Sequence, residues 1–221
     1  ALSSSIELHG PYGGVVPEIA ARDHIKNLPP MICELKFRHQ DLLASIAAIG
    51  VTRGPGLPGC LLAGVGFARG LALAVGSPLF GLSHLEGHLY SPFFGLPLDK
   101  TPFPLLGVVV SGGNTVLYLV EAFGRNETIG ETLDDAAGEL FDKIAFRLGL
   151  GYPGGAQLEK LADSADYSDV PRKLRLPVPM KESGDLNFSY SGLKTAALRL
   201  IDKERLDTRK ELLPAFGRSL M

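Results

Sequence analysis

With 221 residues, 45% of them hydrophobic and 21% charged, the chain has the composition of a globular protein and is long enough for one large domain or two modest lobes. The formal net charge of −2 excludes a global basic field, so an RNA substrate would need a local basic patch or a partner's surface. Cys33 and Cys60 lie far apart in unrelated contexts, which excludes a disulfide framework or a zinc knuckle and predicts free, buried thiols in a reducing compartment.

The first regular elements are predicted from proline positions and apolar runs. Pro17-Glu18 predicts a helix that begins at Ile19 or nearby, because proline suits the start of a helix, and Pro29-Pro30 should break or kink it. The apolar, β-branched run at 45–52 predicts a buried strand that leads into a loop at 53–56.

A helix rich in small residues is expected at 58–75. Each interior glycine costs about 1 kcal/mol relative to alanine, so another backbone or a ligand should come close. These glycines are Gly59, Gly64, Gly66 and Gly70. The helix could dock a partner protein or pack inside its own lobe. Arg69 at its centre and the terminating Ser77-Pro78 favour a buried helix over a membrane span.

The most informative stretch follows a short strand expected at 78–82. His84 and His88 are spaced i and i+4, so in a helix both imidazoles leave the same face about one turn apart, as one metal ion requires. Alternatively, His84 caps the helix and His88 packs at its end, since two histidines do not complete a metal site. The pair follows a strand's end, where ligands of α/β proteins usually bind.

A hinge or boundary is expected at 101–104, which is rich in proline, and a hairpin after it. The runs 105–110 and 115–120 are strand-like, and Ser111-Gly112-Gly113-Asn114 joins them. This turn is either a plain hairpin turn or a nest of backbone N–H groups that binds phosphate or another anion.

The best helix pattern in the chain runs from 132 to 148, with a broad apolar face. Asp134 and Asp135 would favour the helix dipole in the first turn. Glu139 and Asp142 either form a solvated face or contact a ligand, with Gly138 leaving room for that ligand.

The remaining elements are a glycine-rich loop at 149–155, a short helix to Leu161, and a last amphipathic helix that ends at Ile201. The segment 163–184 is polar and interrupted by prolines. It is either a mobile, solvated insertion or a local RNA-facing patch. Its basic residues are Arg172, Lys173, Arg175 and Lys181.

Seven blocks of the chain carry a family resemblance. They run in one order, 12–18 (YGGVVPE), 54–57 (GPGL), 84–88 (HLEGH), 110–115 (VSGGNT), 133–143 (LDDAAGELFDK), 152–155 (YPGG) and 188–194 (FSYSGLK). Together they resemble the TsaD family, tRNA threonylcarbamoyladenosine transferases once described as O-sialoglycoprotein endopeptidases. The resemblance implies a two-lobed, actin/Hsp70-like α/β fold with a metal and a nucleotide-type ligand in the cleft between lobes.

The resemblance also implies roles for individual residues. His84 and His88 would hold one divalent metal ion, iron or zinc. The contacts to threonylcarbamoyl-adenylate would come from Val109, Val110, Ser111, Gly112, Gly113, Asp142 and Gly155. No general base is assigned.

The two ends of the chain depart from the family's pattern. The family's opening Ile-Glu-Thr-Ser-Cys-Asp type loop, its later Gly-Gly-Val-Ser-Ala-Asn loop and its Cys-Thr-Asp-Asn block, whose aspartate completes the metal site, do not occur in the sequence. We therefore expect residues 1–104 to be the remainder of the first lobe. Residues 105–221 would be a second lobe with a helical insertion, incomplete at its C-terminal end.

The expected reaction is metal-assisted transfer of the threonylcarbamoyl group from threonylcarbamoyl-AMP to the adenosine beside the tRNA anticodon. Expected partners are a paralogous actin-like subunit, a small P-loop ATPase and a separate adenylate-forming enzyme. The expected location is the cytoplasm or an organelle, and no membrane is expected to take part. Two alternatives are a metalloendopeptidase, although the H-x-E-G-H spacing differs from HExxH, and a non-catalytic nucleotide-binding scaffold.

Overall fold

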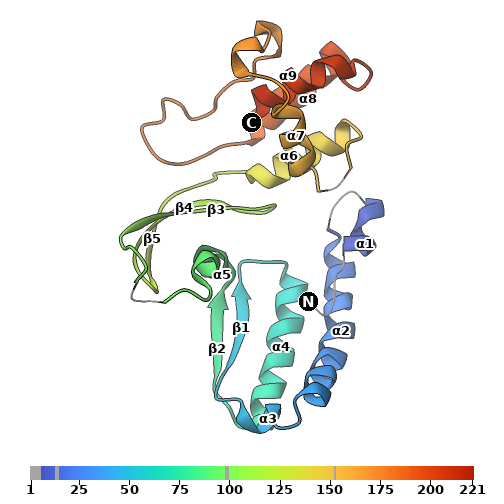
Figure 1. Cartoon of the computed structure of the whole chain (residues 1–221). Coiled ribbons are helices and arrows are strands. Elements are labelled where there is room, and N and C mark those ends of the chain that lie inside the picture. Colours follow the sequence, from blue (N-terminus) through green and yellow to red (C-terminus); the bar gives the residue numbers. More distant parts are fainter. Residues whose placement is uncertain (1–5, 13–14, 98–99, 152) are drawn as a thin grey trace. The chain divides into compact units, whose positions relative to one another are not determined.

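The chain divides into two compact units, which are described separately. The structure is a computed structural model and describes residues 6–12, 15–97, 100–151 and 153–221 (Figure 1). The units are Ala1–Gly95 and Leu96–Met221, so the division precedes the boundary predicted at 104/105. Gly13, Gly14 and Tyr152, which belong to the motifs quoted above, lie outside the described residues.

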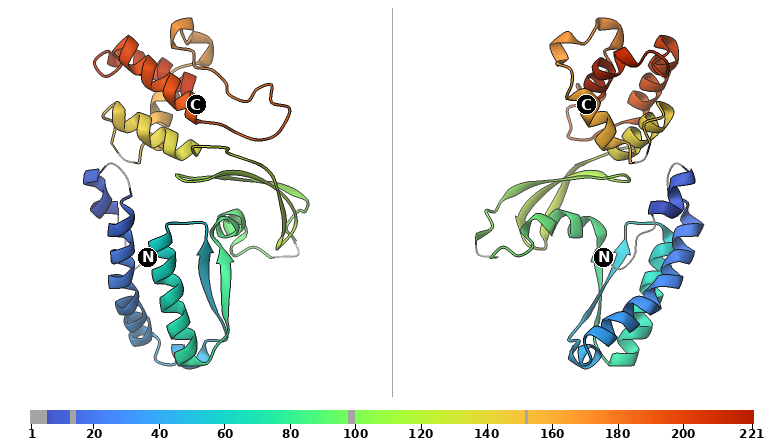
Figure 2. Two further views of the ribbon diagram at one scale, coloured as in Figure 1. Left: turned by 180° about the vertical axis from the view of Figure 1, so that it is seen from behind. Right: turned by 45° about the vertical axis from the view of Figure 1, so that its right-hand side comes forward.

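Unit 1 is built from a pair of parallel strands and the helices beside them. Its elements are α1 (Ile6–His9), η1 (Gly10–Tyr12), α2 (Pro17–Arg38), α3 (Leu42–Ser45), β1 (Ile49–Gly54), α4 (Pro58–Val75), β2 (Leu79–Ser83), α5 (His84–Tyr90) and η2 (Ser91–Phe93). β1 pairs with β2 in parallel, and α4 connects them. α2 lies alongside α4 in every view (Figure 2).

The predicted helix start near Ile19 is confirmed to within two residues, because Pro17 stands at the first position of α2 after an extended Val16. Of the break or kink expected at Pro29-Pro30, the break is wrong, since the helix continues through both prolines to Arg38. Two adjacent prolines remove backbone donors from one place only, and the regular turns on both sides keep the helix continuous.

The predicted bounds of α4 are confirmed, but its predicted burial is not. Only Ala68 and Ala72 are buried, because a two-stranded sheet and α2 are too small to cover the helix. α4 is also long and apolar enough to cross a membrane by length and composition alone, which by itself is weak evidence. β1 likewise has no buried residue, contrary to the prediction of a buried strand.

Close packing explains one of the α4 glycines. A Cβ on Gly59 would lie 2.9 Å from the Cβ of Ala21 in α2, so glycine allows the two helices to approach. At Gly66 and Gly70 a Cβ would meet open space, so packing within the described part of unit 1 does not require these two glycines.

Unit 2 combines an antiparallel sheet with a helical core. Its elements are β3 (Leu105–Val110), β4 (Thr115–Ala122), β5 (Arg125–Glu131), α6 (Ala137–Arg147), α7 (Gly155–Ala162), η4 (Tyr167–Asp169), η5 (Arg172–Leu174), α8 (Ser191–Glu204), η6 (Lys210–Leu212) and α9 (Leu213–Leu220). The sheet order is β3-β4-β5, with Val110 opposite Thr115 at the tip of the predicted hairpin. Leu140, Ile144, Leu158, Ile201 and Phe216 from the four helices are fully buried together.

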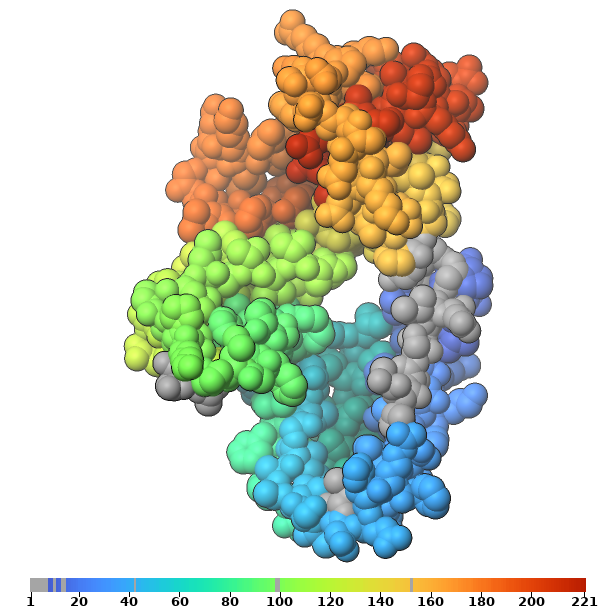
Figure 3. All heavy atoms as spheres, in the orientation of Figure 1, coloured from blue at the N-terminus to red at the C-terminus, as the bar shows by residue number. Residues whose placement is uncertain are grey.

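The segment 163–184 belongs partly to this core, which corrects the expectation of a solvated insertion. Val170 and Leu174 are 2% and 0% exposed and pack with the helices. Figure 3 shows the segment, in orange, over the surface of unit 2. Its polar residues lie outside while two apolar ones anchor it.

Candidate functional site: a histidine pair and a glycine turn

The histidine pair lies on α5, directly after β2, as predicted. The hydroxyl of Ser83 accepts a hydrogen bond from the Glu86 N–H at 3.4 Å, so Ser83 rather than His84 caps this short helix. The Nε2 atoms of His84 and His88 lie 3.2 Å apart, and the two ring centroids are separated by 4.5 Å. Both side chains are exposed. The i, i+4 spacing therefore places the two Nε2 atoms side by side.

The distance between these nitrogens fits two ligands of one metal ion. Zinc binds imidazole nitrogen at about 2.0–2.1 Å with tetrahedral angles, which places two such nitrogens about 3.3–3.4 Å apart. The observed 3.2 Å also suits a hydrogen bond between two neutral rings. Among the residues that the structure describes, no group of three or more His, Cys, Asp or Glu could hold a metal ion. The pair thus supplies two ligands of a site that needs more.

A cavity of about 370 Å³ lies beside His84 within unit 1. Residues 50–52 of β1, Cys60 and Gly64 of α4, and His84 contribute to its wall. The cavity is thus formed near the carboxyl ends of two parallel strands, where α/β proteins usually bind ligands. Burial raises the pKa of the Cys60 thiol, which lowers its thiolate fraction near neutral pH.

The glycine turn lies in unit 2 and is closed by Ser111. The Ser111 N–H donates to the Asn114 carbonyl at 2.8 Å, and the Asn114 N–H donates to the Ser111 hydroxyl at 3.2 Å. Gly112 and Gly113 are exposed, and a Cβ on either would meet open space. Exposed glycine backbone of this kind can approach an anion closely.

The two valines before the turn differ in exposure. Val109 is 5% exposed and faces the interior, whereas Val110 is 56% exposed. A ligand over the turn could therefore reach Val109 only through its backbone. Both remain predicted contacts of the substrate.

α6 packs directly against this turn. A Cβ on Gly138 would lie 2.4 Å from the Ser111 carbonyl oxygen and 2.8 Å from the Gly112 Cα. The room that was expected for a ligand at Gly138 is therefore occupied by the turn itself. This contact brings the predicted turn and the predicted acidic helix together.

Asp142 joins α6 to the loop before α7. Its Oδ1 accepts a hydrogen bond from the Gly154 N–H at 2.7 Å, and Gly155 is the first residue of α7. Glu139 forms an ion pair with Lys143 on the helix surface, as the solvated-face interpretation predicts. Asp142 thus has a structural partner for one oxygen, while its predicted contact with a ligand concerns the other.

Asp134 corrects the predicted start of α6. The helix begins at Ala137 rather than at residue 132, so Asp134 does not lie in its first turn. Its carboxylate accepts hydrogen bonds from the hydroxyls of Ser189 and Ser191 at 2.6 and 2.7 Å. It also accepts from the backbone N–H groups of Tyr190 and Ser191 at 2.7 and 3.2 Å.

These four donors decide the charge of Asp134. Burial would raise its pKa, but the hydrogen bonds from both serines and from the two amides outweigh burial and hold the pKa well below its usual range. The adjacent Asp135 forms an ion pair with Lys194 of α8. Both aspartates therefore attach α8 to the chain before α6. The 188–194 block carries part of the family resemblance, but no local sequence pattern predicts these partners for it.

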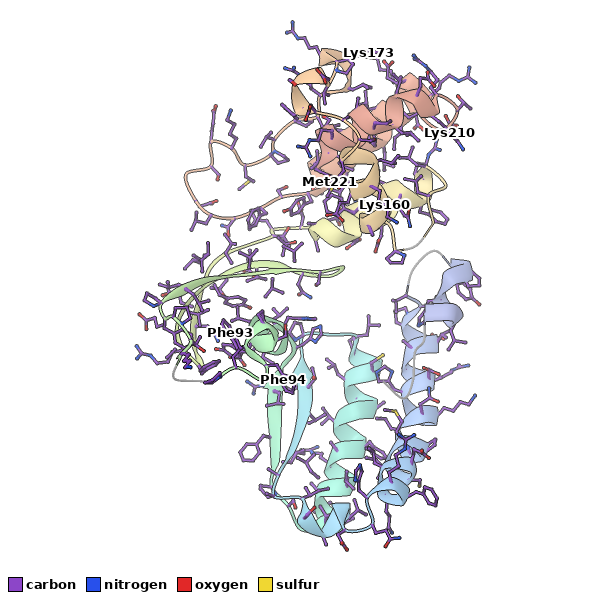
Figure 4. All side chains as sticks on the ribbon, viewed as in Figure 1. Phe93, Phe94, Lys160, Lys173, Lys210 and Met221 are labelled. Carbon is purple, nitrogen blue, oxygen red and sulfur yellow. The ribbon has the colours of Figure 1, made fainter. Side chains whose placement is uncertain are left out.

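Two of the four basic residues of segment 163–184 are bonded within unit 2. Lys173 donates to Glu204 at 3.0 Å, and the Arg175 Nε–H donates to the Val170 carbonyl at 3.2 Å. Lys160, Lys173 and Lys210 come from three different elements of unit 2 (Figure 4). Two of the four basic residues in the segment thus have partners inside unit 2, which weakens the interpretation of the segment as an RNA-facing patch.

Comparison with known proteins gives a family match over most of the chain. Residues 1–216 match the family described as TsaD, tRNA N6-adenosine threonylcarbamoyltransferase. A protein of that name from Nitrosospira multiformis is 50% identical over 206 residues, which cover 93% of this chain and 59% of the relative. A relative of the same name from Thiobacillus denitrificans is 48% identical over 217 residues, which cover 98% of this chain and 62% of that relative.

A third relative of the same name, from Pelobacter propionicus, is 50% identical over 202 residues, covering 91% of this chain and 57% of the relative. The chain therefore spans between 57% and 62% of the length of these three curated relatives.

Proposed function

The chain belongs to the TsaD family of tRNA N6-adenosine threonylcarbamoyltransferases, and from this membership we propose that it takes part in forming threonylcarbamoyladenosine in tRNA. The donor is threonylcarbamoyl-AMP, and the acceptor is N6 of the adenosine adjacent to the anticodon. The amine nitrogen forms a bond to the carbamoyl carbon, the bond from that carbon to the phosphate oxygen breaks, and AMP leaves with the electron pair. The amine loses a proton to a base that is not assigned.

The observation that carries the proposal is the histidine pair. The Nε2 atoms of His84 and His88 lie 3.2 Å apart, as those of two ligands of one iron or zinc ion would. Such an ion would supply Lewis acidity to polarise a carbonyl oxygen of the substrate. Both rings come from α5, whose start is capped by the Ser83 hydroxyl.

In unit 2 the glycine turn would bind the phosphate of the adenylate. The exposed backbone of Gly112 and Gly113 provides N–H donors without a charged side chain, whereas the Ser111 N–H is already bonded to the Asn114 carbonyl. Val109, Val110 and Ser111 extend the same backbone. Asp142 has one oxygen bound to the Gly154 N–H, which leaves its other oxygen to accept from a hydroxyl of the ligand. Gly155 would allow close approach beside it.

The proposal includes partners and a compartment. A paralogous actin-like subunit, a small P-loop ATPase and the adenylate-forming enzyme would act with the protein in the cytoplasm or in an organelle. α4 offers a face for the paralogue, since Gly66 and Gly70 have open space above them and Leu62 and Leu73 are exposed on the same helix.

The test follows labelled threonine into unmodified tRNA. The protein at its full length is combined with the adenylate-forming enzyme, the two other partners and tRNA, and His84→Ala is compared with wild type. His39→Ala, which changes an exposed histidine outside the pair, is the matched control. We expect wild type and His39→Ala to transfer label and to bind about one metal ion per chain, and His84→Ala to lose both by roughly 100-fold.

The other outcomes separate the alternatives. Full transfer by His84→Ala would contradict the role of the pair. Absence of transfer with every partner set, together with retained adenylate binding, would indicate a scaffold. Peptide hydrolysis that disappears in His88→Ala would indicate an endopeptidase.

A further inference from the structure

The helix α6 begins without a cap of its own. Ala136, the residue before its first turn, has no side-chain acceptor, and the N–H of Ala137 is buried. This N–H donates instead to the hydroxyl oxygen of Thr115 at 3.0 Å, from a strand 22 residues earlier. A buried donor at a helix start needs such an acceptor, because water does not reach it.

Thr115 holds the chain before α6 at a second point. Its carbonyl oxygen accepts a hydrogen bond from the Thr132 N–H at 2.9 Å. Thr132 in turn donates its hydroxyl to the Asp135 carbonyl at 2.6 Å. Thr115 therefore binds both ends of the segment 132–137. Thr115 has an exposed fraction of 2%, and among the described residues of unit 2 no other polar or charged residue is buried.

Thr115 also follows the glycine turn directly. It pairs with Val110 across the hairpin, so the four turn residues 111–114 are enclosed by this pair. The turn has no other polar attachment to α6 among the described residues, and it touches the helix through the contact of Ser111 with Gly138. Loss of the Thr115 hydroxyl would leave this contact without directional support.

We propose that Thr115 is a positioning residue: through its hydroxyl it fixes the turn 111–114 over the first turn of α6 and so pre-orients the turn's amides for an anionic group. The proposal rests on the proposed function for the identity of that group, the phosphate of an adenylate. The orientation of the turn itself does not depend on which anion it binds. Pre-orientation matters because each donor that must be ordered on binding reduces affinity.

The test removes the hydrogen bond from either side. Thr115→Val keeps the shape of the side chain and removes the hydroxyl, whereas Thr115→Ser keeps the hydroxyl. Ala137→Pro removes the donor at a helix position that tolerates proline, and it serves if Thr115→Val does not fold. Ile201→Val, a change of one methylene group in the buried part of α8, controls for a general loss of stability.

Two measurements are made on each variant. The first is the pair of ¹⁵N and ¹H NMR chemical shifts of the Gly112 and Gly113 amides. The hydrogen-exchange rate of the Ala137 amide is added for every variant except Ala137→Pro, which lacks that amide. The second is the dissociation constant for AMP. We expect Thr115→Val and Ala137→Pro to move the glycine signals and to weaken AMP binding roughly tenfold, while Thr115→Ser and Ile201→Val stay within about twofold of wild type.

Glycine signals in Thr115→Val and Ala137→Pro that match those of wild type would overturn the proposal, as would an equal effect of Ile201→Val. Wild type that fails to bind AMP would count against the proposed function alone, because the amide shifts still report whether Thr115 positions the turn.

Discussion

Gly138 gives the sharpest test of the contact between the glycine turn and α6. Helix propensity alone predicts that Gly138→Ala stabilises the protein by about 1 kcal/mol, since glycine is unfavourable in a helix. The structure predicts the opposite sign. The new Cβ would lie 2.4 Å from the Ser111 carbonyl oxygen, whereas real Cβ contacts stay at 3.0 Å or more, so backbone must move by at least 0.6 Å.

The cost of this shift can be set against the propensity gain. Overpacking a close contact costs about 1–3 kcal/mol, and here the neighbour is backbone, which cannot change rotamer. After subtraction of about 1 kcal/mol for propensity, we expect Gly138→Ala to destabilise unit 2 by up to about 2 kcal/mol. AMP binding should weaken as well, because the atoms that move belong to the turn.

The assay is urea unfolding followed by far-UV circular dichroism, with the AMP dissociation constant measured in parallel. Gly192→Ala is the matched control, since it lies near the start of α8 in the same unit and its Cβ would meet open space. We expect this control to be unchanged or slightly stabilised, with normal AMP binding. A Gly138→Ala protein as stable as Gly192→Ala would refute the reasoning.

Two further predictions concern charge and thiol reactivity. Asp134→Asn should destabilise unit 2 by about 1 kcal/mol at pH 7, a small value because the carboxylate is exposed. The folded pKa of Asp134 is depressed, so its contribution is present above the unfolded value of about 3.9 and is lost as the pH falls below it. The difference in unfolding free energy between wild type and Asp134→Asn, measured by urea unfolding, should therefore be smaller at pH 3 than at pH 7. An equal difference at both pH values would contradict a depressed pKa for Asp134. Cys33 is exposed while burial raises the pKa of Cys60, so a disulfide reagent at pH 8 should modify Cys33 roughly tenfold faster, and Cys33→Ser should leave only the slow phase. Equal rates at the two thiols would show that Cys60 is as accessible as Cys33.

The exposure of Cys33 illustrates where sequence reasoning failed in unit 1. Both thiols were expected to be free and buried, and both are free in the structure, but Cys33 lies on an uncovered face of α2. The same applies to α4, of which only Ala68 and Ala72 are buried. Apolar composition predicts a helix, but burial depends on what other elements exist to cover it.

In unit 2 one strand and one α-helix were not predicted at all. β5 has the sequence RNETIGE, which lacks the apolar alternation of a typical strand, and it forms because β4 offers hydrogen-bonding partners on that edge. α9 contains Pro214 and Gly217, which are poor helix formers, and it forms because Phe216 and Leu220 are buried against the other helices. In both cases tertiary contacts outweigh local propensity.

The sequence by itself determined the features that depend on neighbours within a few residues. It gave the bounds of α4, the hairpin around Ser111–Asn114, and the helical spacing that places His84 and His88 on one face. Only the tertiary structure decided that α6 begins at Ala137, that Asp134 and Asp135 bind α8, and that Thr115 caps α6. The physical reason is that hydrogen-bond periodicity and turn chemistry are local. The partner of the Asp134 carboxylate lies 56 residues away and that of the Ala137 N–H 22 residues away, where only the folded chain brings them into reach.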